Sequence, residues 1–250
     1  MLIWSLEIWI PFFKGRKGRI KHAGRNLSIA FINTLVLGSL FLKPTAMVLG
    51  WGESLSLGIT RSLDMNIWFS TILAIVLMDG WMYLWHIGNH RIPFLWRFHR
   101  MHHSDSEMDV TTALRFHTGE MVFSSLLRFA VVPLIGMNLW QLILYEIILL
   151  PIIQLHHSNV NIPERWDRYL RAIIVMPNMH RVHHSRWRPE TDSDYASVFS
   201  FWDRIFGSFR LREDFHTLYY GLNAYDADEW QTTWGMLKTP FVEPFRYKKS

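Results

Sequence analysis

The chain has 250 residues, of which 50% are apolar, 13 are tryptophan and only 19% are charged, a balance that indicates a membrane protein. It contains no cysteine, which excludes disulfides, cysteine-bound zinc and iron–sulfur clusters. Much of the formal charge of +5 lies in KGRKGRIKHAGR, residues 14–25, directly before an apolar run. No nucleic-acid-binding motif accompanies it, so we expect membrane-flanking charge and no nucleic-acid partner.

The chain begins with an apolar stretch, residues 1–13, which we interpret as a helix at the membrane surface or as part of a short span. Four longer apolar segments follow at residues 27–49, 67–85, 121–137 and 139–155. The first two approach the roughly 20 residues that a membrane-crossing helix needs. The last two are shorter and are separated only by Asn138, which predicts a tight helical hairpin. The alternative is that all four are buried helices of a soluble enzyme.

The charges predict a topology. With the basic segment in the cytoplasm, the first span leads out and the second returns, and the hairpin then leads out and back. Residues 86–120 and 156–250 would therefore lie on the cytoplasmic side. We predict an all-α polytopic membrane protein of one domain, residues 1–250, with about four membrane-embedded helices and a cytoplasmic helical cap.

Histidines gather in the segments assigned to the cap. HIGNH spans residues 86–90, LHHSN spans 155–159, and the string HR-x-HHS occurs at residues 99–104 and again at 180–185. Spacings of three and four place side chains on one helical face, about 5–6 Å apart, close enough to share an ion. Eight or more imidazoles exceed the three or four that one zinc ion takes, which predicts two metal ions. Imidazole suits zinc, copper, iron and nickel, so ligand type does not select the metal.

The motifs HIGNH, FHRMHHS, TTALRFHTGE, LHHSNV, MPNMHRVHHS and WDRIFGSF occur in this order between Asp79 and Phe209. This stretch resembles the fatty acid hydroxylase/sterol desaturase superfamily of integral membrane di-iron oxygenases. The resemblance implies two non-haem irons at the cytoplasmic face, with O2 as co-substrate. The positions that match the family's ligands are His86, His90, His99, His102, His103, His157, His180, His183 and His184. Two stretches depart from sequences common in the family: residues 86–87 are not His-Arg, and residues 194–196 are not Asn-Tyr-Gly. Neither departure removes a ligand, but both argue against a sterol-specific enzyme.

Four further residues are candidate ligands or neighbours of ligands. His117 matches a recurring family histidine, His156 adjoins His157, and Asn159 follows two residues later. Asp79 lies two helical turns before the first histidine motif, and metal-bound histidines commonly donate a hydrogen bond to such a carboxylate. The alternative for Asp79 is an ordinary charge at a membrane boundary. His22 and His216 are expected to be ordinary core or surface residues.

Two charges lie inside the predicted hairpin. Arg128 is nine residues before the turn at 137–138 and Glu146 is eight residues after it, so we expect them at similar depth. Because a buried charge in lipid usually has a partner, we predict an ion pair that fastens the two helices. The alternative is that Arg128 reaches the membrane surface and Glu146 faces the cap.

The expected activity is O2-dependent hydroxylation, or desaturation, of a membrane lipid such as a fatty acyl chain, a sterol or another isoprenoid. No haem, flavin or cysteine-cluster motif is present, so electrons are expected from a separate reductase with a ferredoxin or cytochrome. The residues that could form its docking face are Arg97, Arg100, Arg181, Arg186 and Arg188. Their alternative is ordinary positive charge on the cytoplasmic side.

The expected location is a membrane: the plasma membrane in a bacterium, or the endoplasmic reticulum in a eukaryote. Two functions compete with the oxygenase. A zinc-dependent membrane lipid hydrolase would act without O2. A metal transport or binding protein would place polar ligands inside the spans, whereas these clusters lie at the span ends.

Overall fold

The computed structural model describes residues 2–242, which form helices and no β-strand. Four helices are long: α2 (Arg19–Ser54), α4 (Ile67–Arg91), α6 (Thr118–Ile135) and α7 (Leu139–His157). The shorter helices are α1 (Leu2–Trp9), α3 (Ile59–Ser62), α5 (Pro93–His103), α8 (Glu164–Leu170), α9 (Pro177–His183), α10 (Arg188–Thr191), α11 (Phe201–Ile205) and α12 (Thr233–Lys238). Short 3-10 turns lie at Thr112–Leu114 and Asn223–Tyr225. The all-α prediction is confirmed; the last residues of the predicted cap, 243–250, lie outside the described part.

The four long helices are each long and apolar enough to cross a membrane. Large apolar side chains on their outer faces are exposed, among them Phe31, Leu42, Trp68 and Ile147. Such a surface is unusual for a soluble protein and expected of helices that face lipid. All four predicted segments are found as helices. Helix α2 starts at Arg19 and not at residue 27, and α4 and α7 extend beyond their predicted ends to include His90 and His157.

Local sequence signals set the ends of these helices. The side chain of Asn66 accepts hydrogen bonds from the first turn of α4, and Asn138 and Gln141 form a capping box at the start of α7. Gly136 ends α6 with a φ of 91°, which glycine adopts without strain. The hydroxyl of Thr60 donates to the carbonyl of Ile135 at 2.9 Å, so α3 holds the turn between α6 and α7.

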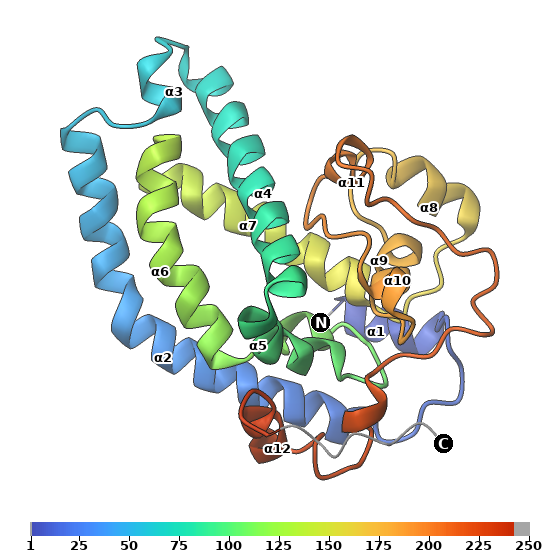
Figure 1. Cartoon of the computed structure of the whole chain (residues 1–250). Coiled ribbons are helices and arrows are strands. Elements are labelled where there is room, and N and C mark those ends of the chain that lie inside the picture. Colours follow the sequence, from blue (N-terminus) through green and yellow to red (C-terminus); the bar gives the residue numbers. More distant parts are fainter. Residues whose placement is uncertain (1, 243–250) are drawn as a thin grey trace.

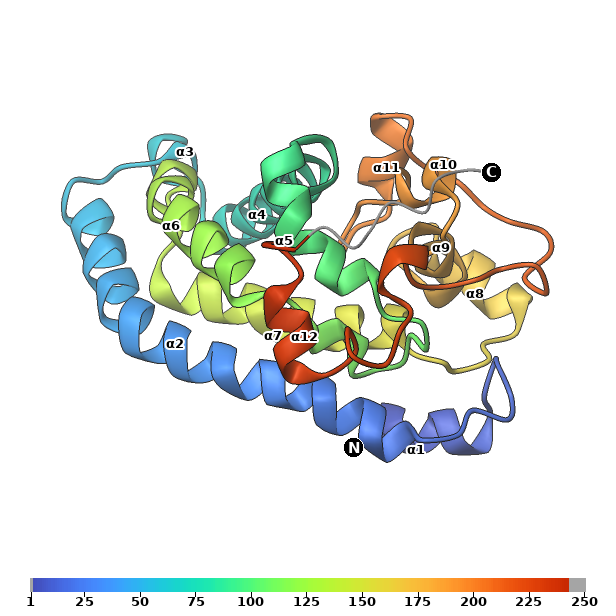
Figure 2. The same ribbon diagram turned by 60° about the horizontal axis from the view of Figure 1, so that its bottom comes forward.

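The long helices form a bundle with α3 at one end and the cap of short helices at the other (Figure 1). Turning the molecule shows α12 lying across α2, with α8 to α11 gathered beyond the end of α7 (Figure 2). Beyond their shared turn α6 and α7 splay apart, so the expected tight hairpin is not formed (Figure 1).

Two apolar cores join these parts. The first lies among the long helices and includes Met78, Val132, Tyr145 and Leu149. The second connects α4 with the cap and contains Tyr83, Val175, Met179, Tyr195 and Ala196. Because it packs the segment around α9 against α4, the second core positions the histidines of α9 relative to those of α4.

The predicted ion pair between α6 and α7 is confirmed. Nη1 of Arg128 donates to Oε1 of Glu146 at 2.6 Å. Both side chains stay partly accessible, at 25% and 34%, so the pair is not sealed inside a helix–helix contact.

Candidate metal centre

Nine histidines from four helices meet where the bundle joins the cap. They divide into two groups, within each of which the candidate ligand atoms all lie within 4.8 Å of one another. The first group contains His86, His90, His99, His103 and His183; the second contains His102, His157, His180 and His184. The structure thus brings together the same nine histidines that the sequence motifs single out.

Each HR-x-HHS string contributes to both groups. From the first string, His99 and His103 belong to the first group and His102 belongs to the second. From the second string, His183 belongs to the first group, and His180 and His184 belong to the second. This follows from the helical period, because residues four apart share a face while adjacent residues point apart. The rings of His103 and His184 stack at a centroid distance of 4.6 Å, so the two groups adjoin.

Burial favours the neutral form of five of these imidazoles. Outside the spans, burial lowers the pKa of His183 to about 3. Burial, reinforced by the neighbouring imidazoles, also lowers the pKa of His102, His103, His180 and His184 well below the usual value. Neutral imidazole is the form that binds metal ions, so these side chains need not lose a proton at neutral pH.

Hydrogen bonds at Nδ1 orient four of the rings. The Nδ1–H groups of His86, His157 and His183 donate to the backbone carbonyls of Tyr195, Ile153 and Ser193 at 2.7, 2.6 and 2.6 Å, and that of His99 donates to Oε1 of Glu120 at 2.9 Å. With the proton on Nδ1, the lone pair of Nε2 faces the group.

Some inner nitrogens contact one another, such as Nε2 of His102 and His157 at 3.1 Å, and others have no hydrogen bond within the described chain. Both ring nitrogens of His90, His103 and His184 are buried without a hydrogen bond, as is Nε2 of His183. Buried polar atoms are rarely left unsatisfied, and here one nitrogen of each ring lies within 4.8 Å of those of its group. This donor set fits two bound cations, each surrounded by four or five imidazoles.

Glu120 is a neighbour of the site for which no role follows from the sequence motifs. It lies in the first turn of α6, accepts the hydrogen bond from His99, and also accepts one from Nδ2 of Asn89 at 3.1 Å. The only sequence signal is its place at the end of RFHTGE, three residues after His117. Its function depends on the approach of α6 to α5, which spacing along the chain does not reveal.

All four other candidates lie outside both histidine groups. His117 caps α6: its Nδ1 accepts from the amide of Gly119, and its Nε2–H donates to the carbonyl of Leu237 at 3.1 Å. His156 packs against His180 at a ring centroid distance of 4.0 Å. The side chain of Asn159 is bonded to the backbone of Phe13, so it fastens the chain after α1 to the end of α7.

Asp79 is buried in α4, and its carboxylate accepts hydrogen bonds from the cap and from α7. It accepts hydrogen bonds from the backbone amides of Val198 and Phe199, from the Trp202 indole and from the Tyr145 hydroxyl, at 3.0 to 3.2 Å. None of its hydrogen bonds involves a histidine in the described chain. Asp79 therefore anchors the segment before α11 to α4.

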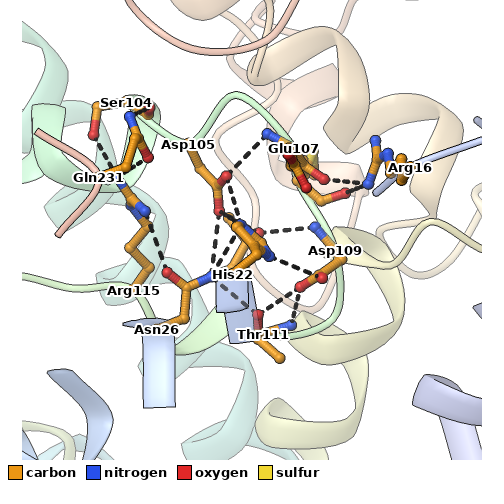
Figure 3. Close-up of polar contacts among 12 residues, drawn as sticks. Arg16, His22, Asn26, Ser104, Asp105, Glu107, Asp109, Thr111, Arg115 and Gln231 are labelled. Atoms are coloured by element: carbon orange, nitrogen blue, oxygen red, sulfur yellow. Dashed lines mark hydrogen bonds and ion pairs between the residues drawn. The ribbon is translucent and has the colours of Figure 1, made fainter. Parts of the chain in front are cut away.

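A buried polar network beside the second histidine motif surrounds His22 of α2 (Figure 3). Its Nε2 lies 2.8 Å from Oδ1 of Asp105 and its Nδ1 lies 3.0 Å from Oδ2 of Asp109. Arg115 continues the network by donating to the carbonyl of Met101 and the hydroxyl of Ser104. These bonds hold the end of α5, and with it the histidines of that helix, against α2.

The arginines expected to form a docking face have separate roles. Arg181 is buried and donates to the carbonyl of Val160 at 2.7 Å, and Arg100 is buried with hydrogen bonds to the carbonyl of Thr239. A docking face that includes these two is therefore wrong. Arg97 and Arg188 are exposed.

A cavity of about 460 Å³ lies between the long helices and reaches the histidines. Its lining includes His86, His99, His102, His157 and His180. Apolar side chains form much of the remaining wall, among them Leu37, Met82, Leu149, Leu150 and Ile153. Mostly apolar cavities with a few polar groups are typical of small-molecule sites, and this one suits a lipid chain.

Comparison with known proteins agrees with this geometry. A sequence model of the fatty acid hydroxylase family matches residues 71–208. Human alkylglycerol monooxygenase is 30% identical over 89% of this chain and 47% of its own length. The ornithine lipid hydroxylase OlsE of Rhizobium tropici is 30% identical over 56% of this chain and 42% of its own. Human cholesterol 25-hydroxylase is 24% identical over 81% of this chain and 74% of its own.

The chain thus spans less than half the length of the first two of these relatives. No solved structure gives a significant match. The four apolar helices and the membrane-enzyme relatives together indicate an integral membrane protein.

Proposed function

This chain belongs to the fatty acid hydroxylase family, and on that premise we propose that it is an O2-dependent di-iron oxidoreductase that hydroxylates a C–H bond of a membrane lipid. One observation carries the proposal: two adjoining groups of buried imidazoles open onto an apolar cavity between apolar helices. The three relatives described above are named as hydroxylases or a monooxygenase, which favours hydroxylation over desaturation.

The two histidine groups would each hold one iron. When bound, the irons would supply the activation of O2 and the redox chemistry that an unreactive C–H bond requires. The protein orients the ligands through Nδ1 hydrogen bonds such as that from His99 to Glu120. The cavity walls hold the lipid and exclude water, which keeps the reacting carbon close to the metal site.

We assign the metal centre to the cytoplasmic side. The basic segment at residues 14–25 lies beside the site, because Arg16 is bonded to the carbonyl of Met108 and His22 to Asp105. Positive segments next to spans remain in the cytoplasm. A separate electron donor, a reductase acting through a ferredoxin or cytochrome, would approach from that side.

Lipid mass spectrometry of cells with and without the protein, grown under 18O2, tests the function. We expect one lipid to gain one labelled oxygen, and the variants His102→Ala and His183→Ala, one from each group, to abolish the product. His216→Ala, at an exposed histidine outside the site, should leave it unchanged. A lipid change that needs no O2 would favour the zinc hydrolase, and loss of two hydrogens without label would favour desaturation.

A further inference from the structure

Four polar residues line the cavity well inside the apolar helices. They are Ser124, Ser125 and Arg128 of α6 together with Glu146 of α7. We call these four residues the polar subsite. Beyond their turn α6 and α7 splay apart (Figure 1). The ion pair of Arg128 and Glu146 bridges them, and both side chains line the cavity.

The polar subsite has unused hydrogen-bonding capacity. A guanidinium has five N–H donors. In Arg128, Nη1 donates to Glu146 and Nη2 lies 3.4 Å from the sulfur of Met82. The buried Nε has no hydrogen-bond partner in the described chain. No hydrogen bond joins the hydroxyls of Ser124 and Ser125 to the described chain. A charged pair inside a membrane is costly and usually functional, and this one is not saturated by protein groups.

Charge indicates what the polar subsite can bind. Arg128 and Glu146 cancel each other, so the polar subsite has no net charge with which to attract an ion. Apart from the second carboxylate oxygen of Glu146, its free groups are N–H and O–H donors, which favour a ligand with an oxygen acceptor. An uncharged hydroxyl, carbonyl or ether oxygen meets both conditions.

Helix geometry places the polar subsite at a defined distance from the metal centre. Arg128 follows Glu120 by eight residues, and Glu146 precedes His157 by eleven. At a rise of about 1.5 Å per residue these separations are about 12 and 16 Å along the two helices. A lipid whose oxidised carbon lies at the histidines would therefore have its oxygen group many carbons away.

We propose that the polar subsite binds an uncharged oxygen group of the lipid that occupies the cavity, and so selects substrates with such a group about 12 to 16 Å from the oxidised carbon. This inference rests on the proposed function for the identity of the occupant. Its binding step requires neither iron nor O2.

Equilibrium binding of radiolabelled 1-hexadecanol to the purified protein in detergent tests this proposal without turnover. Unlabelled 1-hexadecanol and hexadecyl methyl ether should compete at least about tenfold better than hexadecane, as expected for hydrogen bonds to charged groups. The double variant Arg128→Met with Glu146→Gln, which leaves no unpaired charge, should reduce this preference to less than about threefold.

Two further variants keep the test decisive if the double variant does not fold. Ser124→Ala with Ser125→Ala removes two hydroxyls with little change of shape and should lower the preference in the same direction. Leu134→Ala, at an exposed position on α6 outside the cavity, should retain the preference for the alcohol fully.

Equal competition by alcohol and alkane in the unmodified protein, or an unchanged preference in both polar-subsite variants, would mean that the ion pair is structural only. A failed 18O2 experiment with a preserved alcohol preference would reject the oxygenase and leave the binding site standing.

Discussion

The bond between His99 and Glu120 shows how a single contact tunes a ligand. A carboxylate that accepts the Nδ1 proton fixes the tautomer, orients the ring and makes Nε2 a better donor to a cation. Glu120 is itself held by Asn89 of α4, so this contact links three helices around the first group.

We predict that Glu120→Ala weakens iron binding about 10- to 100-fold, the usual effect of losing such a partner. Glu120→Gln keeps an oxygen acceptor and should lose less. Iron retained by the purified protein against a competing chelator measures both variants. The matched control is Glu213→Ala, at an exposed glutamate outside the site. Equal iron retention by Glu120→Ala and the unmodified protein would remove Glu120 from the metal site.

The buried histidines also predict how the stability of the metal-free protein depends on pH. The pKa of His183 is lowered to about 3 by burial, whereas in the unfolded chain it is near 6.5. Between these values the unfolded state binds more protons, so the free energy of unfolding falls as pH decreases below about 6.5. Each such histidine contributes a slope of up to about 1.4 kcal/mol per pH unit.

Thermal unfolding of iron-free protein from pH 7.5 to 5 checks this slope. We expect the midpoint to fall steadily below about pH 6.5, and His183→Gln to show a shallower fall because one buried neutral histidine is gone. A midpoint that rises on acidification would contradict the burial of neutral imidazoles.

At the scale of elements, the contact between α4 and α11 connects the bundle to the cap. The indole of Trp202 donates to Asp79 at 3.0 Å and lies over Gly80. From α11, Asp203 accepts hydrogen bonds from the amides of Tyr195 and Ala196. The carbonyl of Tyr195 in turn accepts the hydrogen bond that orients His86. Two successive hydrogen bonds, from Tyr195 to Asp203 and from His86 to Tyr195, therefore connect α11 with the metal centre.

Gly80→Ala tests that docking. A Cβ at this position would come within 2.9 Å of the Trp202 ring, so the ring and its bond to Asp79 must shift. We expect a loss of about 1–3 kcal/mol in stability, as for other overpacked contacts, together with lower iron retention. The matched control is Gly88→Ala on the same helix, where the nearest atom would lie 3.8 Å away and the change should be neutral or stabilising. Equal stability of the two variants would show that the close approach of Trp202 is unimportant.

At the scale of the whole molecule, the two HR-x-HHS strings can meet only if the chain returns to the same end of the bundle between them. The turn after α6 lies against α3, at the end opposite the cap, and α7 runs back to the histidines (Figure 1). The chain from the first string therefore travels away from the metal centre along α6 and returns along α7.

Single cysteines can test the orientation, because the chain has none of its own. Lys17→Cys and Arg165→Cys, at exposed positions near the metal end, should react with a membrane-impermeant maleimide from the cytoplasmic face. Ser62→Cys, at the exposed end of α3, should react only from the opposite face. The cysteine-free protein is the control, and labelling of all three from one face would refute the proposed topology.

The sequence by itself determined the helical membrane class, the four apolar segments, the nine clustered histidines and the pairing of Arg128 with Glu146, because these depend on local composition, helical period and the cost of charge in lipid. Only the tertiary structure decided that each HR-x-HHS string is shared between two sites, that Glu120 supports His99, that Asp79 anchors the cap, and that Arg181 is buried. These features join residues on different helices, and spacing along one helix carries no information about which other helix lies against it.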